Sequence, residues 1–271
     1  MNEIERTART RREVLGLLGG AGAAVFLAGC GSDNGNTDAT KRTSSSTTTT
    51  AGAGTTSTTT ALASCTQIPT ETAGPYPGDG TNGPNVLTQS GIVRSDIRSS
   101  IGSASGVAKG VPLTIALTVV DSKNACQALP GVAVYLWHCN IDGAYSMYSQ
   151  GVTTENYLRG VQVTDANGGV TFTSIFPAAY SGRWPHIHFE VFPSLAAATN
   201  GANKRAVSQL ALSADACKAV YATDGYGQSV RNLAQTSLQT DNVFSDGSSL
   251  QTPTLAGSTA GGYTAKLVVA V

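Results

Sequence analysis

The sequence predicts an all-β fold, an antiparallel β-sandwich with long loops and at most one or two short helices. Seven short segments rich in Val, Ile, Thr and aromatic residues alternate with turn signals made of Gly, Asp, Asn and Pro, a pattern typical of sandwiches. The chain also has no heptad pattern, no fixed-period repeat and no glycine-rich phosphate loop. These absences argue against coiled-coil, repeat and nucleotide-binding folds.

The expected strands follow one another from residue 111 to the C-terminus. Each combines β-branched or aromatic residues with flanking turn residues. In order they are Leu113–Val120, Val132–His138, Val161–Thr164, Val170–Ser174, His186–Phe192, Val207–Leu212 and Tyr263–Val271. The segment Ser213–Tyr221 opens with a serine cap and an acidic first turn, which predicts a helix. The polar, turn-rich stretch 225–262 is expected to form a long loop or several short ones.

Composition narrows the classes of function. The 271 residues include 17 basic and 17 acidic side chains, and charged residues make up only 13% of the chain, against roughly 25% in globular proteins. Because the two signs cancel, the basic footprint of a nucleic-acid-binding protein is absent, and we expect no nucleic-acid partner. The long apolar run lies near the N-terminus, which excludes a multi-span membrane protein.

The N-terminal 64 residues are expected to be an export signal and a tether. Residues 1–30 resemble a twin-arginine-like lipoprotein signal peptide, with Arg11 and Arg12 before an apolar run that ends at Cys30. We expect Cys30 to be lipidated; a plain signal peptide or a short membrane anchor are the alternatives. Residues 31–64 are rich in Ser and Thr and are expected to be a disordered tether. The folded domain would then span 65–271, exported, extracytoplasmic and held to the cell envelope only through the lipid.

The cysteines are expected to pair, because an exported protein meets an oxidising compartment. Apart from Cys30, the chain has Cys65, Cys126, Cys139 and Cys217, which allow three pairings. The expected strand between Cys126 and Cys139 would separate them by roughly 26 Å, so a bond between these two is disfavoured. We expect Cys65–Cys139 and Cys126–Cys217, with free thiols as the alternative.

Two histidines are the first candidates for metal ligands. His186 and His188 alternate within an apolar strand, so their imidazoles lie on one face at metal-ligand spacing. An isolated pair of this kind is more often a packing feature, but Tyr180 lies six residues upstream and Tyr145 follows an earlier strand. No Asp or Glu occurs between residues 174 and 189. Because tyrosine phenolate is a hard anionic ligand, two phenolates and two imidazoles would suit ferric iron.

Five segments of the chain resemble the intradiol ring-cleavage dioxygenases, the family of protocatechuate 3,4-dioxygenase and catechol 1,2-dioxygenase. The resemblance runs in order from about Glu71 to Leu212 and is closest to a secreted branch with a Trp-His-Cys element. The segments are TETAGPY at 70–76, LPGVAVYLWHCN at 129–140, GAYS at 143–146, YLRGVQVTD at 157–165 and YSGRWPHIHF at 180–189.

The resemblance implies a site and a reaction. One Fe(III) per chain would be held by four ligands, which are Tyr145, Tyr180, His186 and His188. A catechol would bind it through both oxygens while Tyr180 leaves, and both atoms of O2 would enter the ring to give a muconate-type diacid. Arg183 would face the substrate and stabilise developing negative charge, and Gln209 would assist. His138 and Arg159 match no ligand and are expected to pack or brace.

Several alternatives stay open at this stage. A surface β-sandwich that binds aromatics or metal without catalysis is the main rival, and zinc or copper at His186 and His188 is a second. Ala178 and Ala179 stand where the family usually has Gly-Trp, and Pro77 replaces a common tyrosine, so the choice among catechols is open. Helices that pair the cytoplasmic members are replaced by the tether, so the resemblance gives no oligomeric state.

Overall fold

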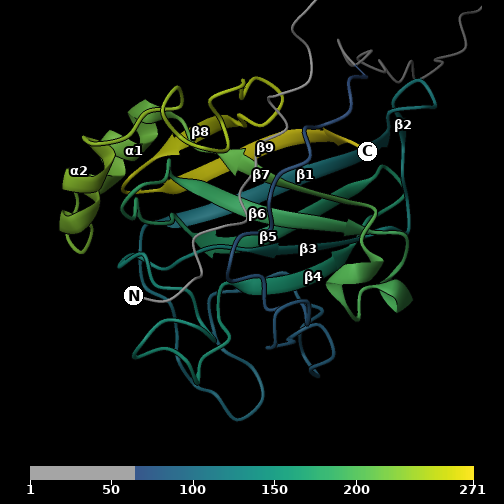
Figure 1. Cartoon of the computed structure of the whole chain (residues 1–271), viewed down its shortest axis with the longest axis horizontal. Helices are drawn as coiled ribbons and strands as arrows, with labels where there is room; N and C mark the ends of the chain where they lie inside the picture. Colours follow the sequence, from purple (N-terminus) through teal and green to yellow (C-terminus); the bar gives the residue numbers. More distant parts are fainter. Residues whose placement is uncertain (1–64) are drawn as a thin grey trace, which may run out of the picture. The chain divides into compact units, whose positions relative to one another are not determined.

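The computed structural model describes residues 65–271, arranged as two β-sheets with two short α-helices (Figure 1). The expected signal peptide, the lipidation site Cys30 and the tether 31–64 lie outside the described residues. Within residues 65–271, no helix is long and apolar enough to cross a membrane.

The first sheet has five strands. It runs in the order β2–β1–β9–β8, with β5 also paired to β1. Its members are β1 (Pro112–Asp121), β2 (Gln127–Ala128), β5 (Gly169–Ile175), β8 (Thr254–Ser258) and β9 (Gly262–Ala270). The β1–β9 pair is parallel and starts at Leu113 opposite Tyr263, whereas the other pairs of this sheet are antiparallel.

The second sheet has four antiparallel strands in the order β4–β3–β6–β7. They are β3 (Ala133–Trp137), β4 (Arg159–Val163), β6 (His186–Phe192) and β7 (Ala206–Ala211). Strand β6 is central and every one of its side chains is buried. It therefore supplies both the sandwich core and a second packed layer on the opposite face.

The main core lies between the two sheets. Alternate residues of β1, such as Ile115 and Leu117, pack with Leu136 of β3 and with Ile187 and Phe189 of β6. This burial is the main stabilising contribution, because apolar area removed from water is worth about 25 cal/mol per Å². A second cluster covers the outer face of the four-stranded sheet, where Val86, Leu87 and Ile92 pack near Tyr135 and Trp137.

The helices are short and gathered at one end of the sheets (Figure 1). Helix α1 (Ala214–Tyr221) begins after Ser213, whose side chain accepts a hydrogen bond from the Ala216 N–H, as its serine cap predicted. Helix α2 (Gly227–Leu233) follows it. Two 3-10 turns, Leu195–Ala197 and Gly201–Asn203, connect β6 to β7.

The predicted fold class is confirmed, and all seven expected strands are present within one or two residues. The β1–β9 pair is parallel, whereas the sequence predicted antiparallel pairing. The stretch 225–262 is not only loop, since it contains α2 and β8. Neither has the apolar periodicity that predicts an element, because α2 buries mainly Ser229 and Asn232 and β8 is an exposed edge strand.

The expected disulfide pairing was wrong. The structure bonds Cys65 to Cys126, with 5.4 Å between their Cα atoms, and leaves Cys139 and Cys217 as buried free thiols. The Ile68 N–H donates to the carbonyl of Ala270, so the start of the described chain lies beside the end of β9, near the β1–β2 turn that carries Cys126. Cys139 instead belongs to the other sheet's outer layer. Sequence distance along one strand could not reveal this juxtaposition.

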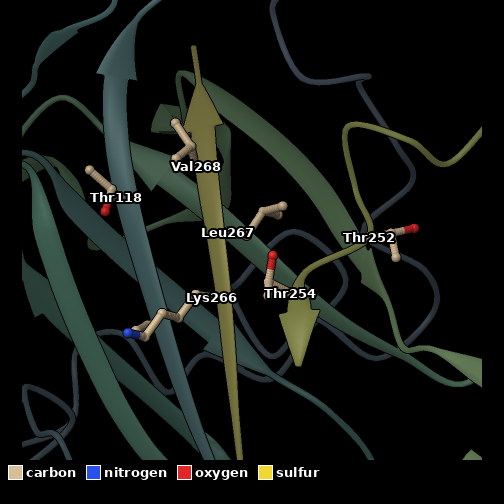
Figure 2. A pocket seen from close by; sticks show the side chains of 7 residues that line it. Thr118, Thr252, Thr254, Lys266, Leu267 and Val268 are labelled. Carbon is tan, nitrogen blue, oxygen red and sulfur yellow. The ribbon is translucent and has the colours of Figure 1, made fainter. Parts of the chain in front are cut away.

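A hollow of about 530 Å³ lies on the outer face of the five-stranded sheet (Figure 2). Thr118 of β1 and Lys266 and Val268 of β9 point into it, together with Thr252 and Thr254 beside them. Those that belong to strands are exposed or half-exposed positions of the sheet, opposite its core face. None of the lining residues is a candidate ligand, so this hollow is separate from the site described next.

Candidate metal centre

The centre is built on strand β6. His186 and His188 alternate with the core residues Ile187 and Phe189, so both imidazoles lie on the outer face of the four-stranded sheet. The imidazole of His188 stacks on the indole of Trp137, its cross-strand neighbour on β3, with ring centroids 4.8 Å apart and 4° between the planes. This stacking fixes the ring orientation of His188.

A backbone carbonyl fixes the second imidazole. Nδ1 of His186 lies 2.6 Å from the carbonyl oxygen of Trp184, so this nitrogen carries the proton and donates it. Nε2 then keeps its lone pair. A metal-binding histidine is commonly held in this way, with one nitrogen donating to a carbonyl and the other free to coordinate.

Two loops bring the tyrosines to the histidines. Tyr145 lies in the loop after β3, and Tyr180 lies in the loop between β5 and β6. The two loops touch at Gly143, where a Cβ would lie only 2.9 Å from the Cβ of Tyr180. Gly143 also has φ of +78°, which favours glycine. The GAYS segment therefore needs its glycine for the close approach of the two tyrosines.

Three candidate donor atoms lie around a fourth, Nε2 of His186. Tyr180 Oη lies 3.1 Å away, His188 Nε2 lies 3.1 Å away and Tyr145 Oη lies 3.4 Å away. The four residues are those that the sequence predicted, and they come from one strand and two separate loops. Three are fully buried, and Tyr180 is half-buried at the open side.

Burial sets the protonation states of the four metal-free donor residues. It lowers the pKa of His186 to about 3 and that of His188 well below its ordinary value, so both imidazoles are neutral at pH 7. Burial raises the pKa of Tyr180 to about 12, and it raises the pKa of Tyr145 well above its ordinary value. Both phenols therefore keep their protons until a cation displaces them.

The donor set fits a hard cation better than it fits a hydrogen-bond network. The lone pair on His186 Nε2 faces two hydroxyls and a second imidazole nitrogen, which is more than one lone pair satisfies. Nδ1 of His188 is buried without a hydrogen-bond partner. In residues 65–271 no group of three or more His, Cys, Asp and Glu side chains could hold a metal. A metal here would need the two phenol oxygens, which ferric iron accepts readily.

Arg183 lies beside the four donors. Its Nη1 is 3.5 Å from His186 Nε2, and its Nη2 donates to Oε1 of Gln209 at 2.7 Å. Gln209 lies on β7 directly opposite His188, and its amide donates to the carbonyl of Thr72 at 2.8 Å. The structure thus brings both sequence-predicted residues to the centre, with Gln209 contacting the arginine.

The sequence reading missed Asp241. Its Oδ2 accepts from Nε of Arg183 at 2.9 Å and from the Trp184 N–H at 2.6 Å. Burial alone would raise the pKa of Asp241, but hydrogen bonds from Arg183 and from backbone N–H groups outweigh it and hold this pKa below its ordinary value. The carboxylate is 58 residues from its partner in a polar stretch without a motif, so no spacing rule pointed to it.

Two further residues have bracing roles. His138 contacts the hydroxyl of Ser174 at 2.7 Å and the carbonyl of Cys139 at 2.8 Å, and none of its hydrogen bonds reaches the four donors. Arg159 is buried and donates to the carbonyls of Tyr76 and Pro77 and to Ser146. The ring of Tyr76 in turn packs against Tyr145 at 5.0 Å. Arg159 therefore braces the loops around the centre.

Comparison with known proteins identifies the family. A family model described as dioxygenase matches residues 82–226, more than half of the chain. The chain belongs to the intradiol ring-cleavage dioxygenases. The match includes Tyr145, Tyr180, Arg183, His186 and His188, and it ends before Asp241. No curated protein matches this intradiol dioxygenase sequence significantly.

Comparison with solved structures finds dioxygenases. An intradiol ring-cleavage dioxygenase from Tetranychus urticae is 26% identical, with a TM-score of 0.53 over 66% of this chain and 86% of that one. The dioxygenase domain of a dioxygenase and carbohydrate-binding fusion from Streptomyces sp. SirexAA-E is 22% identical, with a TM-score of 0.48 over 76% and 98%. A hydroxyquinol 1,2-dioxygenase from Pseudomonas putida DLL-E4 is 15% identical, with a TM-score of 0.46 over 77% and 67%.

Proposed function

We propose that this protein is a non-haem Fe(III) dioxygenase that opens a catechol-type ring between its two hydroxyl-bearing carbons. Both atoms of O2 would enter the product, a muconate-type diacid. The observation that carries the proposal is the convergence of two phenol oxygens and the Nε2 atom of His188 within 3.4 Å of His186 Nε2. Family membership supports the reaction class.

Tyr145, Tyr180, His186 and His188 are the residues that would hold one Fe(III) per chain. When bound, the ion would supply Lewis acidity that binds and polarises the two oxygens of a catechol. The neutral imidazoles offer lone pairs in fixed directions, because Trp184 and Trp137 hold the two rings. Tyr145 is buried whereas Tyr180 is half-buried, so Tyr145 is suited to stay in place through the reaction.

Tyr180 is the candidate proton acceptor. Its hydroxyl lies at the more exposed side of the centre, and burial raises the pKa of this phenol to about 12. In the metal-loaded protein Tyr180 would be a phenolate, and its Oη would accept a proton from an incoming catechol hydroxyl. Tyr180 would then swing away as a neutral phenol and leave room for the substrate.

Arg183 is suited to stabilise negative charge on the ring. Its guanidinium is fixed on two sides by Asp241 and Gln209, which makes it a preorganised cation and not one that must reorganise during the reaction. The reaction adds O2 to a catechol without an external reductant, since every atom of both reactants ends in the diacid. This stoichiometry suits an enzyme outside the cytoplasm.

We further propose export and anchoring of the domain that begins at residue 65. The arginine pair, the apolar run and Cys30 support a lipoprotein signal, and the Ser/Thr-rich stretch supports a tether. The membrane would then be contacted only through the lipid. We expect the Cys30→Ser variant to leave the membrane fraction, and retention of that variant in membranes would contradict the anchor.

The test of the function is product analysis with labelled oxygen. The full chain is loaded with iron and given catechol under ¹⁸O2, with zinc-loaded and metal-free protein as controls. We expect one O2 consumed per catechol and both labelled atoms in a ring-opened diacid, from the iron-loaded protein alone. Catechol binding without turnover would favour the binding module instead, and activity or preferential binding with zinc would reject the ferric site.

A further inference from the structure

We propose that Asp241 positions Arg183 and, by neutralising its charge, makes the site select catechols that carry no carboxylate on the ring. This inference rests on the proposed function and adds a class of substrate to it. Asp241 lies beyond the residues that match the family model, so the device belongs to the C-terminal part of this chain.

The ion pair fixes the direction of the guanidinium. Nε of Arg183 donates to Asp241 Oδ2 at 2.9 Å, and Nη2 donates to Gln209 Oε1 at 2.7 Å. Because the guanidinium is a planar, rigid fork, these two bonds determine where Nη1 lies. Nη1 is the group within 3.5 Å of His186 Nε2. Asp241 and Gln209 therefore aim one end of the arginine at the centre.

The carboxylate itself is held in place. Its Oδ2 also accepts from the Trp184 N–H, and its Oδ1 accepts from the N–H groups of Val243 and Phe244 at 2.9 and 3.2 Å. The side chain of Asp241 is fully buried, whereas that of Arg183 keeps 15% of its surface exposed. The pair is thus a fixed unit whose open side belongs to the arginine.

The surroundings of this pair are acidic. Glu71 is half-buried, and its carboxyl is close enough to feel the charges of Arg183, Asp241 and Asp246. The second nearby cation, Arg159, is already committed to the carbonyls of Tyr76, Pro77 and Ser146 and to two hydroxyls. Arg159 is 1% exposed, so it offers no donor to a ligand.

The charges of Arg183, Asp241 and Glu71 affect which catechols the site can bind. A carboxylate on a catechol ring needs a cation or several donors once it leaves water. Here the exposed cation is already paired with Asp241, and the next charged group is acidic. A catechol without a ring carboxylate needs no such cation or donors. Two unit charges several ångströms apart in a partly buried site change affinity by roughly ten- to fiftyfold, which is enough to discriminate the two classes.

The test compares two ligands on five proteins. The iron-loaded full chain is titrated without O2 with catechol and with 3,4-dihydroxybenzoate, and each Kd is read from the visible absorbance. Wild type is compared with Asp241→Asn, with Arg183→Gln and with the double variant. Asp246→Asn is the matched control, because it removes an exposed acidic charge from the same segment and Asp246 does not contact Arg183. Steady-state rates with O2 are measured in parallel.

We expect wild type to bind catechol more tightly than 3,4-dihydroxybenzoate, and Asp241→Asn to narrow that ratio roughly tenfold or more. The kcat/KM for catechol should fall in the same variant, because Arg183 loses its direction. The double variant should behave like Arg183→Gln alone, since Asp241 acts through the arginine. It leaves neither charge unpaired, so it reports on the pair even where Asp241→Asn folds poorly.

Three results would overturn the inference. One is an unchanged Kd ratio in Asp241→Asn. A second is an equal change in Asp246→Asn, which would assign the effect to the general field. The third is additive losses in the double variant. A wild type that cleaves catechol in any of these cases leaves the proposed function standing, whereas iron-loaded protein without catechol binding or turnover rejects the function itself.

Discussion

Two arginines flank the candidate metal centre, and they differ in the kind of partner they have. Arg159 is 1% exposed and makes five hydrogen bonds, all to uncharged carbonyl and hydroxyl oxygens, of the loops that carry Tyr76 and Ser146 and of Tyr135 on β3. Arg183 is more exposed, is paired with the carboxylate of Asp241, and reaches His186.

This difference in partners assigns one arginine to structural support and the other to the reaction. A guanidinium whose donors are all used cannot respond to a ligand, so Arg159 serves the loops around the centre. Arg183 keeps one end, Nη1, directed at the ligand atoms, so a hydrogen-bond donor points to where the substrate would sit. Both residues lie in segments that resemble the family. Their different roles follow from their contacts and not from that resemblance.

Arg159→Met should give the largest effect, and mainly on stability. The change keeps the apolar stem but leaves several buried carbonyls without donors, each at a cost of about 1–3 kcal/mol. We expect the free energy of unfolding to fall by about 4 kcal/mol or more in urea titrations. Arg98→Met is the control, since its ion pair with Asp96 is exposed and should be worth less than about 1 kcal/mol. Equal losses in the two variants would break the comparison.

Arg183→Gln should mainly affect the rate. Removing one preorganised charge from a polar active site costs about 10²–10³-fold in kcat. We expect kcat/KM for catechol to fall by that factor while iron content and the visible spectrum without substrate stay close to wild type. Loss of iron in proportion to activity would mean that Arg183 serves the metal ligands, and the two arginines would then not differ in role.

Glu190→Gln should have the smallest effect, a change in the pH dependence of stability. Glu190 lies near the loop that Arg159 braces. Glu190 is buried on β6 near Asp79, which follows the Pro77 that Arg159 binds, and Lys204 Nζ forms an ion pair with its Oε1 at 3.1 Å. Burial first, and then the charge of Asp79, raise the pKa of Glu190 to about 8, despite the opposing effect of Lys204.

The sign of the pH dependence follows from that raised pKa. The native state holds this proton more tightly than the unfolded chain, whose glutamates titrate near 4.5. The stabilisation is therefore complete below about pH 4.5 and is lost as the pH rises to about 8, at no more than about 1.4 kcal/mol per pH unit. Urea titrations at pH 5 and pH 8 should show a smaller difference in Glu190→Gln than in wild type. Parallel pH dependence in the two proteins would contradict this assignment.

The sequence predicted the parts of the fold that repeat a simple period. Strand β6 and helix α1 were placed closely because alternation and a serine cap are local signals. The parallel pairing of β1 with β9 and the Cys65–Cys126 bond were not predictable, because neither depends on residues near each other in the sequence. Helix α2 and strand β8 lack apolar periodicity, so their segment was expected to be loop.

The same contrast holds at the centre. Tyr145, Tyr180, Arg183, His186 and His188 lie in motifs that resemble a family, so they could be named from sequence. Their convergence depends on Gly143 and on the carbonyl of Trp184, which spacing alone does not reveal. Asp241 has neither a motif nor a fixed spacing, and only the fold brings it to Arg183.

The most direct test of the central claim is the visible absorption spectrum of the iron-loaded full chain, before and after catechol is added without O2. If Tyr145 and Tyr180 bind ferric iron as phenolates, the protein should be coloured by a tyrosinate-to-iron charge-transfer band, and the band should shift on catechol addition. Tyr145→Phe should weaken the band. Stoichiometrically bound iron without a visible band would contradict the assignment of the two tyrosines.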